Sequence, residues 1–133
     1  MSKPRDPWWP YVKNVLRAYP AMKRELEDLR RASVTVRYNQ AGGGGGPGRT
    51  TEQTALRELP PARQREYDAV RKAITRTGHM PDGKLRNDII RLVYFRKRYT
   101  LSGAAYACHV SYATAKNWHQ HFLRLVASEL GLN

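Results

Sequence analysis

Apolar residues recur at helical spacing through the first 32 residues of the chain. Successive members lie three or four positions apart, as on one face of an amphipathic or coiled-coil helix: Trp8, Val12, Val15, Tyr19, Met22, Leu26 and Leu29. Pro20 lies within this stripe, and a mid-helix proline removes a backbone hydrogen bond. We therefore expect a kink or two abutting helices near Tyr19. The stripe requires a partner surface, which is either the chain's own domain or a second copy in a homo-oligomer.

Two segments after the stripe lack its helical spacing of apolar residues. Residues 33–38, SVTVRY, alternate between apolar and polar side chains, which is typical of a short strand or an extended arm. Five consecutive glycines at 42–46 follow, with Pro47 and Gly48, and ordering them costs too much backbone entropy for helix or strand. We predict a flexible linker over residues 41–50, which separates an N-terminal helical element (1–40) from a second helical part (51–133).

Capping and breaking residues divide the second part into helices. Thr50 or Thr51 can cap a short helix that runs through Leu59. Pro61 suits the first position of the next helix, and Gly78 suits its end. Residues 82–98 form the most core-like segment. We expect one helix there, with Leu85, Ile89, Leu92 and Val93 facing inward and Arg86, Arg91, Arg96, Lys97 and Arg98 facing outward.

The last third of the chain predicts two helices joined by a tight turn. Thr100 or Ser102 can cap a helix through about His109, and Ser111 can cap a second helix to about Leu130. Small residues suit a steep crossing of this pair, and larger apolar residues fill the space beneath it: Ala104, Ala105, Ala115, Val110, Trp118, Phe122 and Leu125. The pattern is that of a helix-turn-helix at residues 100–130. The alternative is a helical hairpin that has only a structural role in a bundle.

The turn itself departs from the usual helix-turn-helix. A glycine with positive φ is common at this position, and the chain has His109 instead. Histidine tolerates positive φ somewhat better than most residues.

The outward face of the second helix carries groups that can read DNA bases. Asn and Gln pair with adenine in the major groove, Thr and Ala methyl groups contact the thymine methyl group, and Lys reaches guanine or phosphate. We therefore expect base readout from Ala113, Thr114, Lys116, Asn117, Gln120 and His121.

A second set of polar and basic residues surrounds that face. The basic run FRKRY precedes the two helices, and it is either a phosphate clamp or a solvated helix end favoured by the helix dipole. Polar groups at a helix start can also hydrogen-bond the DNA backbone. The expected phosphate contacts are Arg96, Lys97, Arg98, Thr100, Ser111, Tyr112 and Arg124.

The net charge agrees with a nucleic-acid partner. The chain has 24 Lys and Arg against 11 Asp and Glu, a formal charge of +13, and basic proteins bind nucleic acids by releasing counterions from phosphates. A ribosome-associated protein, a membrane-surface protein and a merely basic solvated surface remain alternatives. No signal-peptide pattern and no run of about 18 apolar residues is present. We therefore expect a cytoplasmic protein that does not span a membrane.

These residues carry a resemblance to a known family. TEQTALREL, a helix ending at Gly78, and LRNDIIRLVYFRKRYTLSGAAYACHVSYATAKNWHQHFLRLVASELGL resemble the RinA/ArpU group of phage transcriptional regulators. The likeness covers residues 50–132, and the C-terminal half of that family is similar to region four of bacterial sigma factors. It implies an all-helical DNA-binding activator of phage late genes that acts in a bacterial host cell. The family's recognition helix corresponds to residues 112–124, and host RNA polymerase is the implied second partner.

Signatures of catalysis are weak throughout. Cys108 and His109 are neighbours, and neighbours on a helix point in different directions. His119 and His121 are two positions apart, unlike a metal-binding pair at i and i+4. The GGGGGPGRT run lacks the Lys-Ser/Thr ending of a phosphate-binding loop. We expect no enzyme, no metal and no cofactor.

Three hypotheses follow for the function. The first is a sequence-specific regulator that binds double-stranded DNA. The second is a DNA-packaging protein similar to a small terminase subunit, which also joins a helix-turn-helix to an oligomerising helical element. The third is an adaptor that binds RNA polymerase or a sigma factor and has no affinity for duplex DNA.

Overall fold

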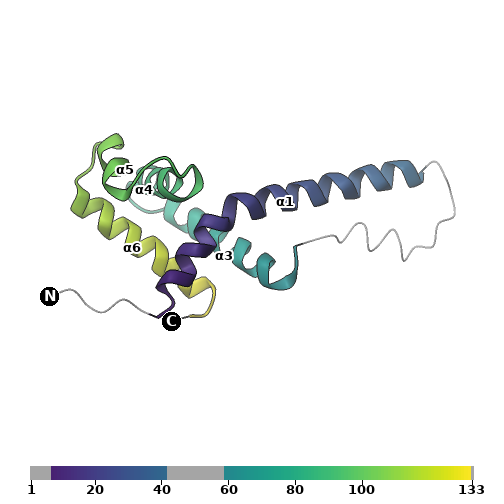
Figure 1. Ribbon diagram of the computed structural model, residues 1–133, viewed down its shortest axis with the longest axis horizontal. Helices are drawn as coiled ribbons and strands as arrows, with labels where there is room; N and C mark the ends of the chain where they lie inside the picture. The colour runs from purple at the N-terminus through teal and green to yellow at the C-terminus, as the bar shows by residue number, and fades with distance from the viewer. Residues whose placement is uncertain (1–6, 42–58, 133) are drawn as a thin grey trace. The chain divides into compact units, whose positions relative to one another are not determined.

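Every regular element in the described part of the chain is a helix. The computed structural model describes residues 7–41 and 59–132 (Figure 1). Its elements are α1 (Trp9–Ala41), α3 (Pro61–Gly78), α4 (Gly83–Ile90), the π-helical turn η1 (Arg91–Phe95), α5 (Leu101–Ala107) and α6 (Tyr112–Glu129). The prediction of an all-α fold is confirmed. Nearly all of the expected linker at 41–50 and most of the short helix before Leu59 lie outside the described residues.

The described residues divide into two units. The first comprises residues 7–19 and 65–132, and the second comprises residues 20–41 and 59–64. This division does not coincide with the boundaries expected from the glycine run, because the start of α1 belongs with the C-terminal helices. The second unit is small, and an ion pair joins its residues Arg63 and Glu25 at 2.8 Å. Helices α4, α5 and α6 and α3 from residue 65 onward belong to the first unit, whereas the first four residues of α3 belong to the second.

The apolar stripe of α1 is largely buried within the chain itself. Trp9, Val12, Val15, Leu16 and Tyr19 are buried in the first unit. Tyr19 stacks on Tyr67 of α3 with ring centroids 5.3 Å apart, and its other neighbour is Phe95 at 5.0 Å. This part of the stripe therefore docks on the chain's own helices. Met22 and Leu26 of the second unit are also buried, and Trp8 and Leu29 are half-buried.

The structure changes two expectations for the N-terminal segment. Helix α1 is continuous through Pro20, so the alternative of two abutting helices near Tyr19 is wrong. Residues 33–38 are helical, not extended. Their β-branched residues lower helix propensity by only a few tenths of a kcal/mol each. Extending an existing helix adds one hydrogen bond per residue, which outweighs so small a preference.

Helix α3 begins and ends where its sequence predicts. Pro61 occupies the first position and Gly78 the last. The chain then turns through Asp82, which has a positive φ of 59°, into Gly83 at the start of α4. A Cβ at Gly83 would lie 2.5 Å from the Thr77 carbonyl oxygen, so only glycine permits this close approach of α4 to the end of α3.

The segment expected as one helix over residues 82–98 is shorter and changes its winding. Helix α4 is followed directly by η1, in which the Arg96 N–H donates to the Arg91 carbonyl oxygen five residues earlier. Regular structure ends at Phe95, and Lys97 adopts a positive φ of 55°. Arg96, Lys97 and Arg98 thus lie after the helix and not on its outward face. Arg86 is also misassigned, because it is half-buried and its guanidinium lies over Trp118.

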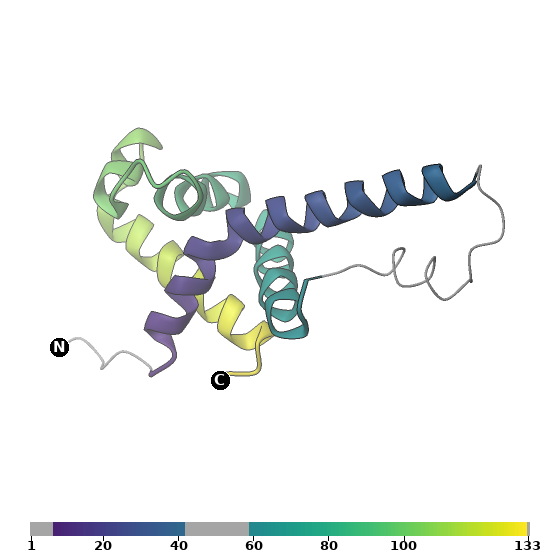
Figure 2. The same ribbon diagram turned by 45° about the vertical axis from the view of Figure 1, so that its right-hand side comes forward.

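Helices α5 and α6 pack through the small residues that their pattern indicates. Figures 1 and 2 show α5 beside the N-terminal half of α6. Ala104, Ala105 and Ala115 are buried in one cluster with Ile89 of α4. Around them pack Leu92, Val93, Leu101, Cys108, Val110 and Trp118. This cluster holds α6 on a scaffold made by α4 and α5.

Within residues 7–41 and 59–132, no helix combines enough length with enough apolar character to cross a bilayer.

Candidate nucleic-acid interface

Helix α6 has a buried face and a polar face. Ala115, His119, Phe122, Leu123, Val126 and Ala127 are buried. Of the residues expected to read bases, Ala113, Lys116, Asn117 and His121 are exposed, whereas Thr114 and Gln120 are half-buried. Glu129 is the first acidic residue of the helix. A continuous polar and basic surface is therefore presented to solvent from the start of α6 to Arg124.

All seven residues expected to contact phosphates are exposed. They come from three segments: the chain after η1, the start of α5, and helix α6 itself. Arg96, Lys97 and Arg98 form a short non-helical stretch, and none of the described carboxylates pairs with them. This stretch is free to place three positive charges beside a polyanion.

The two helix starts are capped as their sequence predicts. The Thr100 hydroxyl accepts a hydrogen bond from the Gly103 N–H at 3.1 Å, and the Ser111 hydroxyl accepts one from the Thr114 N–H at 3.1 Å. Ser111 also donates to the Thr114 hydroxyl oxygen at 2.8 Å. The Ser111 hydroxyl is therefore used first to organise the start of α6, and a phosphate contact from it would replace the bond to Thr114.

His109 occupies the turn between α5 and α6 with a positive φ of 61°. Its N–H donates to the Tyr106 carbonyl oxygen at 3.1 Å, and the Val110 N–H donates to the Ala105 carbonyl oxygen at 3.0 Å. This pair of bonds is the Schellman arrangement, which normally has glycine at the left-handed position. Histidine thus takes the conformation expected of glycine at this turn.

Two tyrosines near the turn between α5 and α6 are exposed. Tyr106 of α5 is 86% exposed and Tyr112 at the start of α6 is 52% exposed. The Lys116 ammonium lies 5.8 Å from the Tyr112 ring centroid, within the range of a cation–π contact. Tyr112 is one of the expected phosphate contacts, whereas Tyr106 is not among the expected site residues.

His119, which was considered as a metal ligand, lies in the core. It is 8% exposed, and its Nε2 lies 2.5 Å from the Tyr94 hydroxyl oxygen. The edge of the Trp9 ring approaches it with centroids 6.1 Å apart. His119 shares helical spacing with Ala115, Phe122 and Val126, and this spacing was the signal that it faces inward.

His121 lies on the opposite side of the helix, among cations. Partial burial lowers its pKa first, and the positive charges of Arg86, Arg124 and Arg76 lower it further. These arginines come from α4, α6 and α3. The imidazole therefore marks a region of positive potential at one edge of the polar face.

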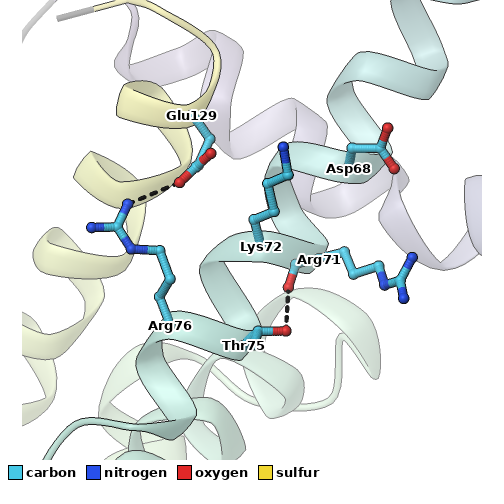
Figure 3. Close-up of a pocket in the computed structure, with 6 residues that line it drawn as sticks. All are labelled: Asp68, Arg71, Lys72, Thr75, Arg76 and Glu129. Atoms are coloured by element: carbon cyan, nitrogen blue, oxygen red, sulfur yellow. Dashed lines mark hydrogen bonds and ion pairs between the residues drawn. The ribbon is translucent and has the colours of Figure 1, made fainter.

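A hollow of about 350 Å³ lies between α3 and α6. Figure 3 shows Arg76 reaching Glu129 across it, while Asp68, Arg71 and Lys72 project from α3. The Arg76–Glu129 ion pair measures 2.8 Å, and Thr75 bonds back to the Arg71 carbonyl oxygen. Three cations and two carboxylates line the hollow, and the Arg76–Glu129 ion pair joins α3 to the end of α6.

The described residues contain no group of three or more His, Cys, Asp or Glu side chains placed to hold a metal ion. Cys108 is half-buried against the core cluster, and burial raises the pKa of its thiol. A raised pKa reduces the thiolate fraction and hence the reactivity of a cysteine.

Comparisons with protein-family models, with curated proteins and with solved structures found no match to this chain.

Proposed function

We propose that the chain is a transcriptional regulator that binds double-stranded DNA in a sequence-specific manner, with α6 in the major groove. The observation that carries this proposal is the polar face of α6. Lys116, Asn117 and His121 are exposed on a helix whose other face is buried against α4 and α5. Exposed amide and ammonium groups on one rigid helix are the means by which base edges are read.

Phosphate binding supports the same placement. Arg96, Lys97 and Arg98 are exposed directly before α5, and Arg124 is exposed near the other end of the polar face. Lys and Arg contacts to phosphates fix the register of a protein on the duplex without reading its sequence. The basic residues before α5 and Arg124 on α6 would both be available to phosphates with α6 in the groove.

The resemblance to RinA/ArpU regulators suggests the organism and the genes on which the protein acts. We propose a phage or prophage protein that activates late genes in the bacterial cytoplasm by binding near a promoter and contacting RNA polymerase. Residues 112–124 correspond to the recognition helix in this scheme, and no enzymatic step is required.

Selection of bound fragments from a random duplex pool tests the proposal. The expected result is an enriched motif, and fluorescence titrations of that motif should show affinity that falls steeply with salt concentration. Recovery of no motif, together with no salt-dependent affinity, would refute it and favour a polymerase or sigma-factor adaptor. Light scattering in the same buffer addresses packaging, because a ring of eight or more subunits would point to a small terminase subunit.

A further inference from the structure

A hollow of about 480 Å³ lies at the edge of the polar face of α6. The turn after α3 forms one wall, α4 forms another, and α6 forms the third. Its lining residues are Met80, Pro81, Arg86, Asn117, Trp118 and His121. Asn117 and His121 therefore face both the expected base-reading surface and this hollow.

Neutral groups hold Arg86 in this hollow. Its Nε–H donates to the Pro81 carbonyl oxygen at 3.1 Å, and its Nη1 lies 3.5 Å from the Met80 sulfur atom. Its guanidinium carbon lies 5.4 Å from the centroid of the Trp118 ring. These contacts orient the guanidinium group and leave its Nη2 hydrogens as donors.

The charge of Arg86 is not compensated by its neighbours. Arg76 pairs with Glu129 at 2.8 Å, and Arg91 pairs with Asp88 at 3.0 Å. By contrast, no carboxylate in the part of the chain that the structure describes pairs with Arg86. A half-buried, oriented and unpaired guanidinium is suited to bind an anion through charge-assisted hydrogen bonds.

Arginines also lie around His121, whose pKa is lowered first by partial burial and then by their positive charges. Arg86 faces it from α4, Arg124 from α6, and Arg76 with its partner Glu129 from α3 and the end of α6. An anion among these groups would be attracted by all of them. It would also favour the imidazolium form, which can donate from both ring nitrogens.

We propose that this hollow binds one phosphate group of the DNA backbone, with Arg86 and His121 as its ligands. This inference rests on the proposed duplex binding and assigns His121 to the backbone instead of the bases. Phosphates flank the groove that a recognition helix enters, and the hollow lies beside Asn117 on the same helix. The Trp118 ring, over which the Arg86 guanidinium lies, also lines the hollow.

The first test uses sulfate as the probe, because its charge stays constant through a histidine titration. The imidazole signal of His121, assigned with His121→Gln, is followed by NMR against pH in sodium sulfate and in chloride of equal ionic strength. Sulfate should raise the pKa of His121 in the wild-type chain and in Arg91→Gln, and much less in Arg86→Gln. Equal responses in both arginine variants, or no response in the wild type, would overturn the site.

The second test uses the duplex selected from the random pool. Arg86→Gln should weaken binding by about tenfold, lower the salt slope by about one, and leave the sequence preference unchanged. Arg86→Lys keeps the charge and should recover the salt slope, which separates charge from folding. Arg91→Gln should stay near wild type. Circular dichroism melts of all variants check that each is folded.

The two proposals fail in different ways. If the wild-type chain binds duplex DNA but Arg86→Gln behaves as Arg91→Gln does, the phosphate site is wrong and the proposed function stands. If the wild type binds no duplex, both are wrong, whatever sulfate does to His121.

Discussion

The Tyr94 hydroxyl oxygen and the Nε2 of His119 lie 2.5 Å apart in the buried interior of the first unit. Tyr94 belongs to η1 and His119 to α6, so the contact joins the two elements through side chains 25 positions apart. The rings are nearly parallel, with centroids at 5.6 Å. Because His119 is held inward, Asn117 and His121 on the same helix are directed outward.

Removal of the Tyr94 hydroxyl should destabilise the fold. Tyr94→Phe keeps the ring but leaves the His119 nitrogen without this partner in a buried site, and we expect a loss of about 1–3 kcal/mol in the free energy of unfolding. Urea denaturation followed by circular dichroism measures it. Tyr106→Phe is the matched control, since that side chain is 86% exposed and should change stability by less than about 0.5 kcal/mol. Equal losses in the two variants would contradict a role for the Tyr94–His119 contact.

The start of α6 allows stability and DNA binding to be separated. Aspartate caps helices as well as serine does, so Ser111→Asp should keep the wild-type stability, whereas Ser111→Ala should lose about 1 kcal/mol. A carboxylate about 4 Å from a phosphate is repelled by about 1 kcal/mol in water, or roughly fivefold in affinity. Ser111→Asp should therefore bind the selected duplex more weakly at low salt. Wild-type affinity in Ser111→Asp would remove Ser111 from the interface.

Base readout and phosphate binding should respond differently to mutation. Asn117→Ala should relax the sequence preference at one position, at a cost of roughly 1–3 kcal/mol for the preferred base pair. Lys97→Gln should weaken all duplexes alike and lower the salt slope by about one. Lysine and glutamine both carry a Cβ, so the positive φ at position 97 strains the wild type and the Lys97→Gln variant equally. Binding to a panel of single-substitution duplexes distinguishes the two patterns, with the exposed Lys23→Gln on α1 as the control.

An altered sequence preference in Lys97→Gln would contradict its assignment to phosphate. An unaltered preference in Asn117→Ala would count against the outward face of α6 as the reading surface.

Alkaline pH should destabilise the fold through Tyr19. Burial raises the pKa of Tyr19 from 10 to about 12, and the stacked Tyr67 contributes to the shift. The folded state thus holds this proton more tightly than the unfolded state does. The corresponding stability is complete below pH 10 and is lost as the pH rises to 12, by about 2–3 kcal/mol in total. Urea titrations across this range should show a shallower decline for Tyr19→Phe than for the wild type or Tyr106→Phe.

Local signals in the sequence predicted much of the C-terminal fold. Pro61 begins α3 because proline has a fixed φ and no N–H to leave unpaired in the first turn, and Gly78 ends it. Thr100 and Ser111 cap α5 and α6 because their hydroxyls accept hydrogen bonds from N–H groups within one turn. The positive φ of His109 was likewise predictable from its place in the turn. Each of these features depends on neighbours in sequence.

The errors involve interactions between distant positions. Arg86 folds onto Trp118, which lies 32 positions later, and no local pattern indicates that contact. The alternation in residues 33–38 is too short to compete with a helix already 24 residues long at that point. The polar face of α6 was predictable from its period, whereas the hollow beside it needed the turn after α3 to be placed.

The π-helical turn of residues 91–95 gives the chain one more residue than an α-helix of the same hydrogen-bonded span would contain. Each residue of an α-helix advances the chain by about 100° around the axis. Deletion of one residue between Arg91 and Phe95 would therefore rotate the segments that follow about the helix axis more than it would shorten the chain. It would re-aim α5 and α6 against α4, so this segment is where insertions and deletions would alter which side of α6 is exposed.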